Sequence, residues 1–378
     1  MQLSEDQQIM SDMAAAFSRD QLRPNAQAWD EKGALDRDVL KSLSELGFGG
    51  LYTSEEFGGS GLSRFEAVLI FEQLAKGCIS HATFLSIHNM ATWMVDRFGS
   101  DALRSEFVPR LAAADLIASY CLTEPGSGSD AASLKTTAVR DDDDYVLNGS
   151  KVFISGAGFS DIYLVMARTS DSGANGISAF LVERDTPGLS FGKNERKMGW
   201  KAQPTAMVMF DDCRIPSTHR IGPEGDGFKY AMAGLDGGRL NIAACSLGGA
   251  QDAFDRAVAY AQDRKQFGRA LVDFQANQFK IADMETALQA ARALLHTAAR
   301  KLDGNADDAT RHCAMAKRFV TDTGFQVANE ALQIHGGYGY LAEYDVERIV
   351  RDLRVHQILE GTNEIMRVII SRALLGGR

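Results

Sequence analysis

The hydrophobic period of this chain changes twice, and this limits the folds that it can adopt. Up to about residue 114, apolar and small side chains recur every three or four positions, as Ile9, Met13 and Phe17 do, which predicts helices. From about Leu116, short runs rich in β-branched and aromatic residues predict strands. The helical period returns at Gly227 and continues toward the C-terminal end. We therefore expect an α+β multidomain protein.

Three domains follow from this order. Residues 1–115 are predicted to form an N-terminal all-α domain, residues 116–222 a middle β domain (a barrel or sandwich), and residues 223–378 a C-terminal four-helix bundle. Besides a helix that begins near residue 4, we expect helices over about residues 36–46, 65–75, 80–98, 227–263, 274–301, 307–335 and 363–374.

The middle domain contains short strand-like runs bounded by Gly, Pro, Asn and Asp. These runs are Leu116–Leu122, Leu134–Val139, Tyr145–Leu147, Val152–Ser155, Ile162–Ala167, Ile177–Val182 and Ala206–Phe210. Between two of them, Asn148-Gly149 favours a tight hairpin turn, because both residues tolerate positive φ.

Charge and composition exclude several classes of partner and site. The chain has 378 residues, with 40 Lys and Arg against 50 Asp and Glu, and it shows no basic tract. Nucleic acid and anionic membrane are therefore poor partners, and an anionic ligand must be held by local arginines and helix ends. The five cysteines form no CxxC pair, which indicates a reducing compartment without disulfides. The seven histidines show no metal-binding spacing, so we predict no metal site.

The N-terminal stretch resembles the start of a helix and not a targeting segment. Ser4 and Gln7 make a capping box, and residues 1–10 lack the pattern of a signal peptide. No run of about 18 apolar residues predicts a membrane span. We expect a bacterial cytoplasmic protein, although a mature organellar protein would have the same features.

A Gly-x-Gly pattern lies in the loop Tyr120–Asp130, whose sequence is YCLTEPGSGSD. A Rossmann phosphate loop must open a helix, yet residues 131–140 have the pattern of a loop and a strand. The alternative is a loop whose hydroxyls and backbone N–H groups surround a planar cofactor and an anionic ligand.

A single carboxylate, Glu360, lies in the segment Val355–Arg367 between an apolar run and Gly361. Thr362 or Asn363 can cap the helix that follows. Burial beside apolar neighbours disfavours the charged form of an acid, which suits a general base for a weakly acidic C–H group. From this segment alone, a surface glutamate between two helices is the more frequent structure.

Four ordered motifs resemble those of the acyl-CoA dehydrogenase family. They are Cys121–Asp130 with Ser133, Arg264–Gly268, Gln333–Tyr340 with Glu343, Arg348 and Asp352, and Leu359–Thr362. The resemblance covers essentially the whole chain and implies the α, β, four-helix order deduced above. It also implies bound FAD, oxidation of acyl-CoA thioesters, electron transfer to an electron-transferring flavoprotein, and a homotetramer built as a dimer of dimers.

The resemblance assigns roles to individual residues. It implies that Glu360 is the catalytic base. The positions that it aligns with FAD contacts are Tyr120, Cys121, Leu122, Thr123, Gly128, Ser129, Phe153, Ile154, Ser155, Arg264, Phe274, Gln275, Gln333, Ile334, His335, Gly336, Gly337, Thr362, Asn363 and Glu364, some of them from a neighbouring subunit. Those aligned with substrate contacts are Ser129, Asp236, Gly237, Gly238, Arg239, Gly361 and Arg372.

The resemblance also bears on the base and the substrate. Isovaleryl-CoA dehydrogenases carry their base immediately before the arginine that corresponds to Arg239, and this chain has Gly238 there. Further runs resemble the members that oxidise isobutyryl-CoA: Ser86–Met90, Ser119–Ser133, Ile154–Gly158, Gly188–Gly192, Gly234–Ala243 and Arg351–Glu360. Oxidation of 2-methylbutyryl-CoA or butyryl-CoA, an acyl-CoA oxidase, and a catalytically silent flavoprotein scaffold are the alternatives.

Overall fold

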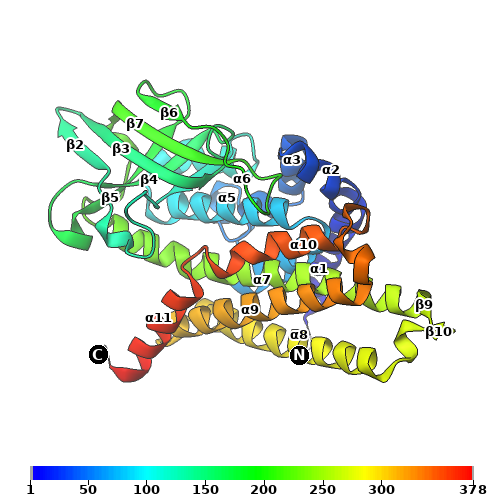
Figure 1. Cartoon of the computed structure of the whole chain (residues 1–378). Helices are drawn as coiled ribbons and strands as arrows, with labels where there is room; N and C mark the ends of the chain where they lie inside the picture. The colour runs from blue at the N-terminus through cyan, green and yellow to red at the C-terminus, as the bar shows by residue number, and fades with distance from the viewer. Residues whose placement is uncertain (1–2, 377–378) are drawn as a thin grey trace.

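The computed structural model describes residues 3–376 and shows three structural parts in chain order (Figure 1). An N-terminal set of helices and a C-terminal set of helices pack against each other, and a β-sheet lies over one end of both. The helix α5 (Ile79–Phe98) runs under the sheet and contacts both β1 (Ala118–Cys121) and the long helix α7 (Gly227–Asp263). The predicted order of helices, strands and helices is confirmed.

The N-terminal part contains six α-helices among the described residues. They are α1 (Glu5–Phe17), α2 (Ala26–Lys32), α3 (Arg37–Glu45), α4 (Arg64–Gly77), α5 (Ile79–Phe98) and α6 (Asp101–Ala112). The predicted capping box at Ser4 and Gln7 is present, and Ser100 caps α6 through the backbone N–H of Leu103. The apolar face predicted for the first helix is only partly correct, because Ile9 is exposed.

The strands of the middle part form one mostly antiparallel sheet. They are β1 (Ala118–Cys121), β2 (Thr137–Asp141), β3 (Asp144–Ser155), β4 (Ile162–Arg168), β5 (Ile177–Glu183), β6 (Leu189–Phe191), β7 (Thr205–Pro216) and β8 (Arg220–Ile221). Their order is β6-β7-β3-β2-β4-β5-β8, and β1 pairs in parallel with β4, with Ala118 opposite Ile162. The path through these strands does not close into a barrel, so the sandwich alternative is the one that fits.

The predicted hairpin turn at Asn148-Gly149 is wrong. The strand β3 continues through both residues, and the turn lies at the other end of the β2–β3 ladder, where Asp141 is paired with Asp144. A Cβ at Gly149 would lie 2.8 Å from the Cα of Thr136, so this glycine permits a close backbone approach and not a turn. The runs 145–147 and 152–155, predicted as two strands, are therefore one.

The C-terminal part contains the four predicted helices and a fifth. They are α7 (Gly227–Asp263), α8 (Gln275–Asp303), α9 (Ala309–His335), α10 (Val346–Arg354) and α11 (Asn363–Leu375). The helix α10 was missed because it has nine residues and a largely charged sequence, VERIVRDLR. A short hairpin of β9 (Lys265–Gln266) and β10 (Arg269–Ala270) projects from the end of α7 (Figure 1).

The long helix α7 is the central element of the helical core. It contacts α4, α5, α8, α9 and α10. Glycines allow the close approach on one side, since a Cβ at Gly248 would lie 2.1 Å from the carbonyl oxygen of Glu72 on α4. Within residues 3–376, no helix combines the length and apolarity that crossing a membrane requires.

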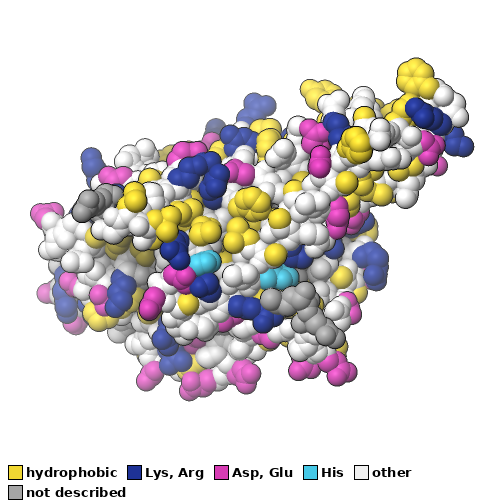
Figure 2. Space-filling model, turned by 90° about the horizontal axis from the view of Figure 1, so that it is seen from below, with side chains coloured by type: hydrophobic (Ala, Val, Ile, Leu, Met, Phe, Trp, Pro, Cys, Tyr) yellow, Lys and Arg dark blue, Asp and Glu magenta, His cyan; other side chains and the backbone are white. Residues whose placement is uncertain are grey.

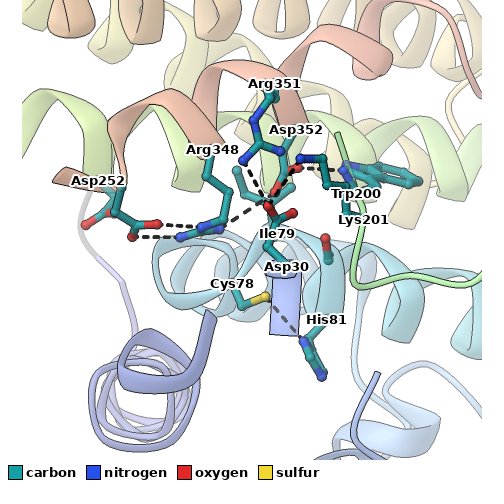
Figure 3. A network of polar contacts seen from close by, with 12 residues as sticks. Asp30, Cys78, Ile79, His81, Trp200, Lys201, Asp252, Arg348, Arg351 and Asp352 are labelled. Atoms are coloured by element: carbon teal, nitrogen blue, oxygen red, sulfur yellow. Dashed lines mark hydrogen bonds and ion pairs between the residues drawn. The ribbon is translucent and has the colours of Figure 1, made fainter. Parts of the chain in front are cut away.

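A buried polar network joins all three parts around α10 (Figure 3). Asp352 accepts a hydrogen bond of 2.6 Å from the backbone N–H of Trp200, which lies in the loop between β6 and β7. Arg351 donates to Asp30 on α2 at 2.9 Å. His356 bonds both Trp200 Nε1, at 3.1 Å, and Ser246 Oγ, at 2.5 Å. The network therefore fixes the segment that leads directly into the Glu360 turn.

Candidate active site

The turn that carries Glu360 lies between two helical segments. The short 3₁₀ helix Val355–Gln357 ends just before it, and α11 begins just after it. Thr362 caps α11, because its Oγ1 accepts a hydrogen bond of 3.2 Å from the backbone N–H of Ile365. Of the two caps that the sequence allowed, Thr362 is the one used.

Glu360 has a left-handed backbone, with φ of +55°, and Gly361 follows with φ of +85°. A residue other than glycine in this conformation is held at a cost of about 1–3 kcal/mol, and it persists where the surrounding structure determines it. Such strained residues gather at functional sites. Contacts with other elements therefore hold this turn.

The carboxyl group of Glu360 lies against the glycine face of α7. A Cβ at Gly238 would lie 2.6 Å from Oε2 of Glu360, so only glycine leaves room for the acid. Oε2 is buried and has no hydrogen-bond partner within residues 3–376. Burial raises the pKa of Glu360 to about 7, against the opposing effects of Arg239 and Lys317. The predicted rise in its pKa is confirmed.

Arg239 and Asp236 lie beside the turn on the same helix. Arg239 is buried and pairs with Asp236 at 2.6 Å, while its Nε lies 3.5 Å from the backbone oxygen of Glu360. Thr310 on α9 donates its hydroxyl to Asp236 at 2.6 Å. The structure therefore brings Asp236, Gly238 and Arg239 to the base, while their contacts with a CoA ester stay a prediction.

Lys317 on α9 is a residue of this site that the sequence analysis missed. It is fully buried, and its Nζ donates to the backbone oxygen of Gly361 at 2.8 Å and to Oδ1 of Asn363 at 2.9 Å. One signal was available: Lys317 is the only charged side chain on a stripe of α9 that otherwise presents small and apolar residues, such as Cys313 and Val320.

Arg64 at the start of α4 was also missed. Its guanidinium carbon lies 3.5 Å from the ring centroid of Tyr52 and 4.8 Å from that of Trp93. A Cβ at Gly237 would lie 2.4 Å from Nη1 of Arg64, so the second glycine of this pair also leaves room for a side chain. No sequence pattern singled out Arg64, because an arginine in the first turn of a helix is usually exposed.

A buried ion pair holds the base of the 120–130 loop. Lys151 on β3 donates to Glu124 at 2.7 Å, and Glu124 also accepts from the backbone N–H groups of Lys135, at 2.6 Å, and Thr136, at 2.9 Å. Burial raises the pKa of Tyr120 well above its usual value, and the charge of Glu360 adds to this effect. The carboxyl group of Glu360 therefore lies near Tyr120, at the start of this loop.

The predicted cofactor residues on the sheet differ in whether their backbone or their side chain can face a ligand. The side chains of Cys121 and Ile154 are buried in the core of the sheet, so only their backbone can face a ligand. In contrast, Phe153 is 68% exposed and has a φ of +58°, which places an aromatic side chain on the surface of β3. Asn363 is buried and bonds Asp322 at 2.7 Å, so its amide positions the turn.

A second group of predicted cofactor residues lies at the other end of α7. Arg264, Ile334, His335, Gly336 and Gly337 line a hollow of about 470 Å³. By the helix rise of 1.5 Å per residue, this end lies about 40 Å from Gly238. We therefore expect these two groups of residues in one chain to contact different FAD molecules.

Both groups fit parts of a large planar cofactor. The hydroxyl of Tyr120 is buried, and no residue from 3 to 376 pairs with it. At the far end, a Cβ added at Gly336 or Gly337 would meet no atom within 4 Å, and Arg264 forms no ion pair with any described residue. An aromatic surface near a base and an open arginine site suit a ring system and a diphosphate, respectively. Side chains that could together hold a metal ion are absent from residues 3–376.

Comparisons with known proteins agree with this geometry. The N-terminal, middle and C-terminal domain models of acyl-CoA dehydrogenase match residues 4–115, 119–213 and 225–375. The mitochondrial isobutyryl-CoA dehydrogenase of Bos taurus is 52% identical over 99% of this chain and 90% of its own length.

Solved structures share the fold over nearly the whole chain. A chain from a structure described as the electron transferring flavoprotein of Acidaminococcus fermentans is 41% identical, covers 99% of both chains and has a TM-score of 0.97. The structure described as PigA with FAD and proline is 33% identical, covers 100% of this chain and 99% of its own, and has a TM-score of 0.96. The chain belongs to the acyl-CoA dehydrogenase family and is an oxidoreductase with acyl-CoA dehydrogenase activity.

Proposed function

We propose that this enzyme removes the α-proton and β-hydride of a short, branched acyl-CoA, with isobutyryl-CoA as its substrate, methacrylyl-CoA as its product and Glu360 as the base. The observation that carries the proposal is the state of Glu360. Its Oε2 is buried without a partner and its pKa lies at about 7, so it can accept a proton near neutral pH.

FAD is the cofactor, and it supplies the acceptor for the hydride that leaves Cβ. Tyr120–Ser129 and Phe153–Ser155 would hold its ring system near Glu360. Arg264, Phe274, Gln275 and Gln333–Gly337 would hold the rest of an FAD bound mainly by a neighbouring subunit. The cofactor roles of Thr362, Asn363 and Glu364 stay predictions, and the buried amide of Asn363 leaves it an indirect role.

Residues of this chain control the proton affinity of the base and the binding of the thioester. Closure of the pocket by the acyl-CoA removes water from Glu360 and raises its proton affinity further. The backbone N–H of Glu360 donates no hydrogen bond within residues 3–376, so it is available to the thioester oxygen. Ser129, Asp236–Arg239, Gly361 and Arg372 would contact the CoA ester.

A homotetramer is the assembly that we propose. Around the far end of α7, Phe267 is 92% exposed and Tyr340 is 83% exposed. Figure 2 shows hydrophobic side chains on the arm that projects from the body and along the adjoining face. Large exposed apolar surfaces mark interaction sites, and a second subunit here would complete the Arg264 site.

The comparisons support the proposed substrate and electron acceptor. A relative that is 52% identical over nearly the whole chain is named for isobutyryl-CoA, a compound of valine breakdown. The 0.97 TM-score to a chain in an electron transferring flavoprotein structure supports such a flavoprotein as electron acceptor. We place the enzyme in the bacterial cytoplasm, or in the mitochondrial matrix if the chain is a mature eukaryotic protein.

Anaerobic flavin bleaching tests the substrate. Isobutyryl-CoA should reduce the flavin faster than 2-methylbutyryl-CoA or butyryl-CoA at equal concentrations. Faster reduction by either alternative would replace the proposed substrate, and rapid peroxide production in air would identify an oxidase. Freshly purified protein that has no visible flavin spectrum and does not bind added FAD would favour a scaffold.

Substitution of the base tests the mechanism. Glu360→Gln should retain FAD and lose about 10²- to 10⁴-fold in turnover, the usual contribution of general-base catalysis. The control is Glu106→Gln, which changes an exposed glutamate on α6 and should leave turnover unchanged. Flavin reduction at the normal rate in Glu360→Gln would show that the base lies elsewhere.

A further inference from the structure

Lys317 is a buried lysine that the proposed chemistry leaves without a role. It lies on α9, behind the Glu360 turn, and its side chain is fully buried. A buried ammonium is costly unless it is paired, and a lysine is among the residues least often buried. A stability argument alone would favour an apolar side chain at this position.

No carboxylate compensates Lys317 directly. No carboxylate oxygen of residues 3–376 lies within 4.0 Å of its Nζ. Its two acceptors are instead the carbonyl oxygen of Gly361, at 2.8 Å, and the side-chain oxygen of Asn363, at 2.9 Å. Lys317 is therefore bonded to the catalytic turn itself and not to a structural counter-ion.

The amide of Asn363 is fixed so that its oxygen faces Lys317. Its Nδ2 donates to Oδ1 of Asp322 at 2.7 Å and lies 3.0 Å from Oγ1 of Thr321. Asp322 also accepts from Gln357, at 2.8 Å, on the segment before the turn. Side chains of α9 thus hold the turn on both sides of Glu360.

Resting on the function proposed above, we propose that Lys317 is the positioning residue of the catalytic base. Through the Gly361 carbonyl, its ammonium holds the left-handed Glu360–Gly361 backbone in place, and its charge keeps the buried Glu360 in the ionised form that accepts the proton. Lys317 does not touch the substrate or the reacting atoms. It acts through the position and charge state of Glu360.

The electrostatics of the site agree with this role. Burial lowers the pKa of Lys317 to about 7 and raises that of Glu360 to about 7, and the charge of each group opposes the shift in the pKa of the other. Arg239 and Lys317 both lower the pKa of Glu360. The charged or titratable groups that face this pair are Arg239 and Asp236 on α7, Asp322 on α9, Glu364 on α11, His356 before the turn, Tyr120 on β1 and Tyr52.

Lys317→Met tests the proposal in the FAD-loaded enzyme. Loss of the hydrogen bond to the Gly361 carbonyl should lower kcat about 10- to 100-fold, because a small displacement of a catalytic group lowers the rate by about this factor. KM should change little. Loss of the cation should also raise the apparent pKa on the acid limb of kcat/KM by about one unit, the usual effect of one nearby charge. Lys301→Met, a half-buried lysine on α8 that pairs with Asp308, is the matched control and should change neither quantity.

Lys317→Arg separates charge from position and guards against a methionine variant that fails to fold. The arginine keeps a cation but cannot reproduce the bond to Gly361, so kcat should fall while the acid limb keeps its wild-type pH. An acid limb that is unmoved in Lys317→Met, or that moves equally in Lys317→Arg, would overturn the role of the charge. Unchanged kcat in both variants would overturn the role in positioning.

Failure of the proposal for Lys317 can be distinguished from failure of the proposal that Glu360 is the base. If Glu360→Gln is inactive at every pH while Lys317→Met has the wild-type rate and pH profile, the inference about Lys317 fails and the proposed base stands. If Glu360→Gln is fully active, the proposed function of Glu360 fails first.

Discussion

The two ends of α7 contrast in how complete they are within one chain. Near Gly238, Arg239 of this helix lies in a buried cluster with Glu360 and Lys317, and its hydrogen bonds reach Asp236 and the backbone of the Glu360–Gly361 turn. Near Arg264, the helix ends beside an open hollow, next to the highly exposed Phe267. In the proposed tetramer, we therefore expect proton transfer to use residues of one subunit, and the second end of α7 to contact an FAD held largely by a neighbouring subunit.

The contrast also separates two uses of glycine. Gly237 and Gly238 are helical residues that make room for Arg64 and Glu360. Gly336 has φ of +59° and ψ of −139°, a conformation essentially restricted to glycine, and its missing Cβ faces open space. Gly237 and Gly238 make room for side chains, whereas Gly336 leaves its backbone open at the hollow, where we expect a ligand.

Of the variants that test this contrast, Gly238→Ala is expected to have the largest effect. The new Cβ would lie 2.6 Å from Oε2 of Glu360, the far end of a flexible side chain, so the acid moves and the helix does not. A displacement of the carboxyl group by about 1 Å should lower kcat by about 10²-fold. Alanine in a helix interior is also favoured over glycine by about 0.5–1 kcal/mol, so Tm should be equal or higher. Steady-state kinetics and thermal unfolding measure the two quantities.

Gly234→Ala is the matched control, one turn earlier on α7. Its Cβ would lie 3.0 Å from Sδ of Met94, a flexible thioether that can move aside. This variant should have the same gain in helix stability and a normal kcat. A normal kcat in Gly238→Ala as well would show that the glycine face does not position the base.

The sequence predicted elements better than contacts. The period of α7 and the capping box at Ser4 are local properties, and the structure confirms them. The turn at 148–149 was mispredicted, because Gly149 is required by the close approach of Thr136, just before the neighbouring strand β2, a contact that no local pattern encodes. Glu360 was recognised from its motif, whereas Lys317 was missed, because it reaches the base from a position 43 residues earlier in the chain.

The second effect concerns stability and the charge of Glu360. Its pKa is raised to about 7 in the folded chain, above an unfolded value of about 4.3. Between these values the folded state keeps a proton that the unfolded state loses, so stability falls as pH rises and the full cost is present above pH 7. Glu360→Gln removes this cost, and its free energy of unfolding should exceed that of the wild type by about 2 kcal/mol at pH 8.

At pH 4, below both pKa values, the glutamine variant and the wild type should be equally stable. Thermal unfolding at the two pH values, with Glu106→Gln as the control for loss of a carboxylate, measures this difference. An equal gain at both pH values would mean that glutamine packs better at the turn, and the raised pKa would then not be the cause.

The smallest effect is expected at the open end, from Arg264→Met. Arg264 lines the hollow without an ion pair inside the described chain, so its cation is free to meet the diphosphate of FAD. Loss of one such charged contact should weaken FAD binding about tenfold, measured from the FAD released on dilution. Lys265→Met is the control, since Lys265 is an exposed cation on β9 of the projecting hairpin and its loss removes the same charge. Equal losses of FAD in both variants would reduce the site to general electrostatic attraction. A fall in kcat of Arg264→Met at saturating FAD would show that the two ends of α7 do not act separately.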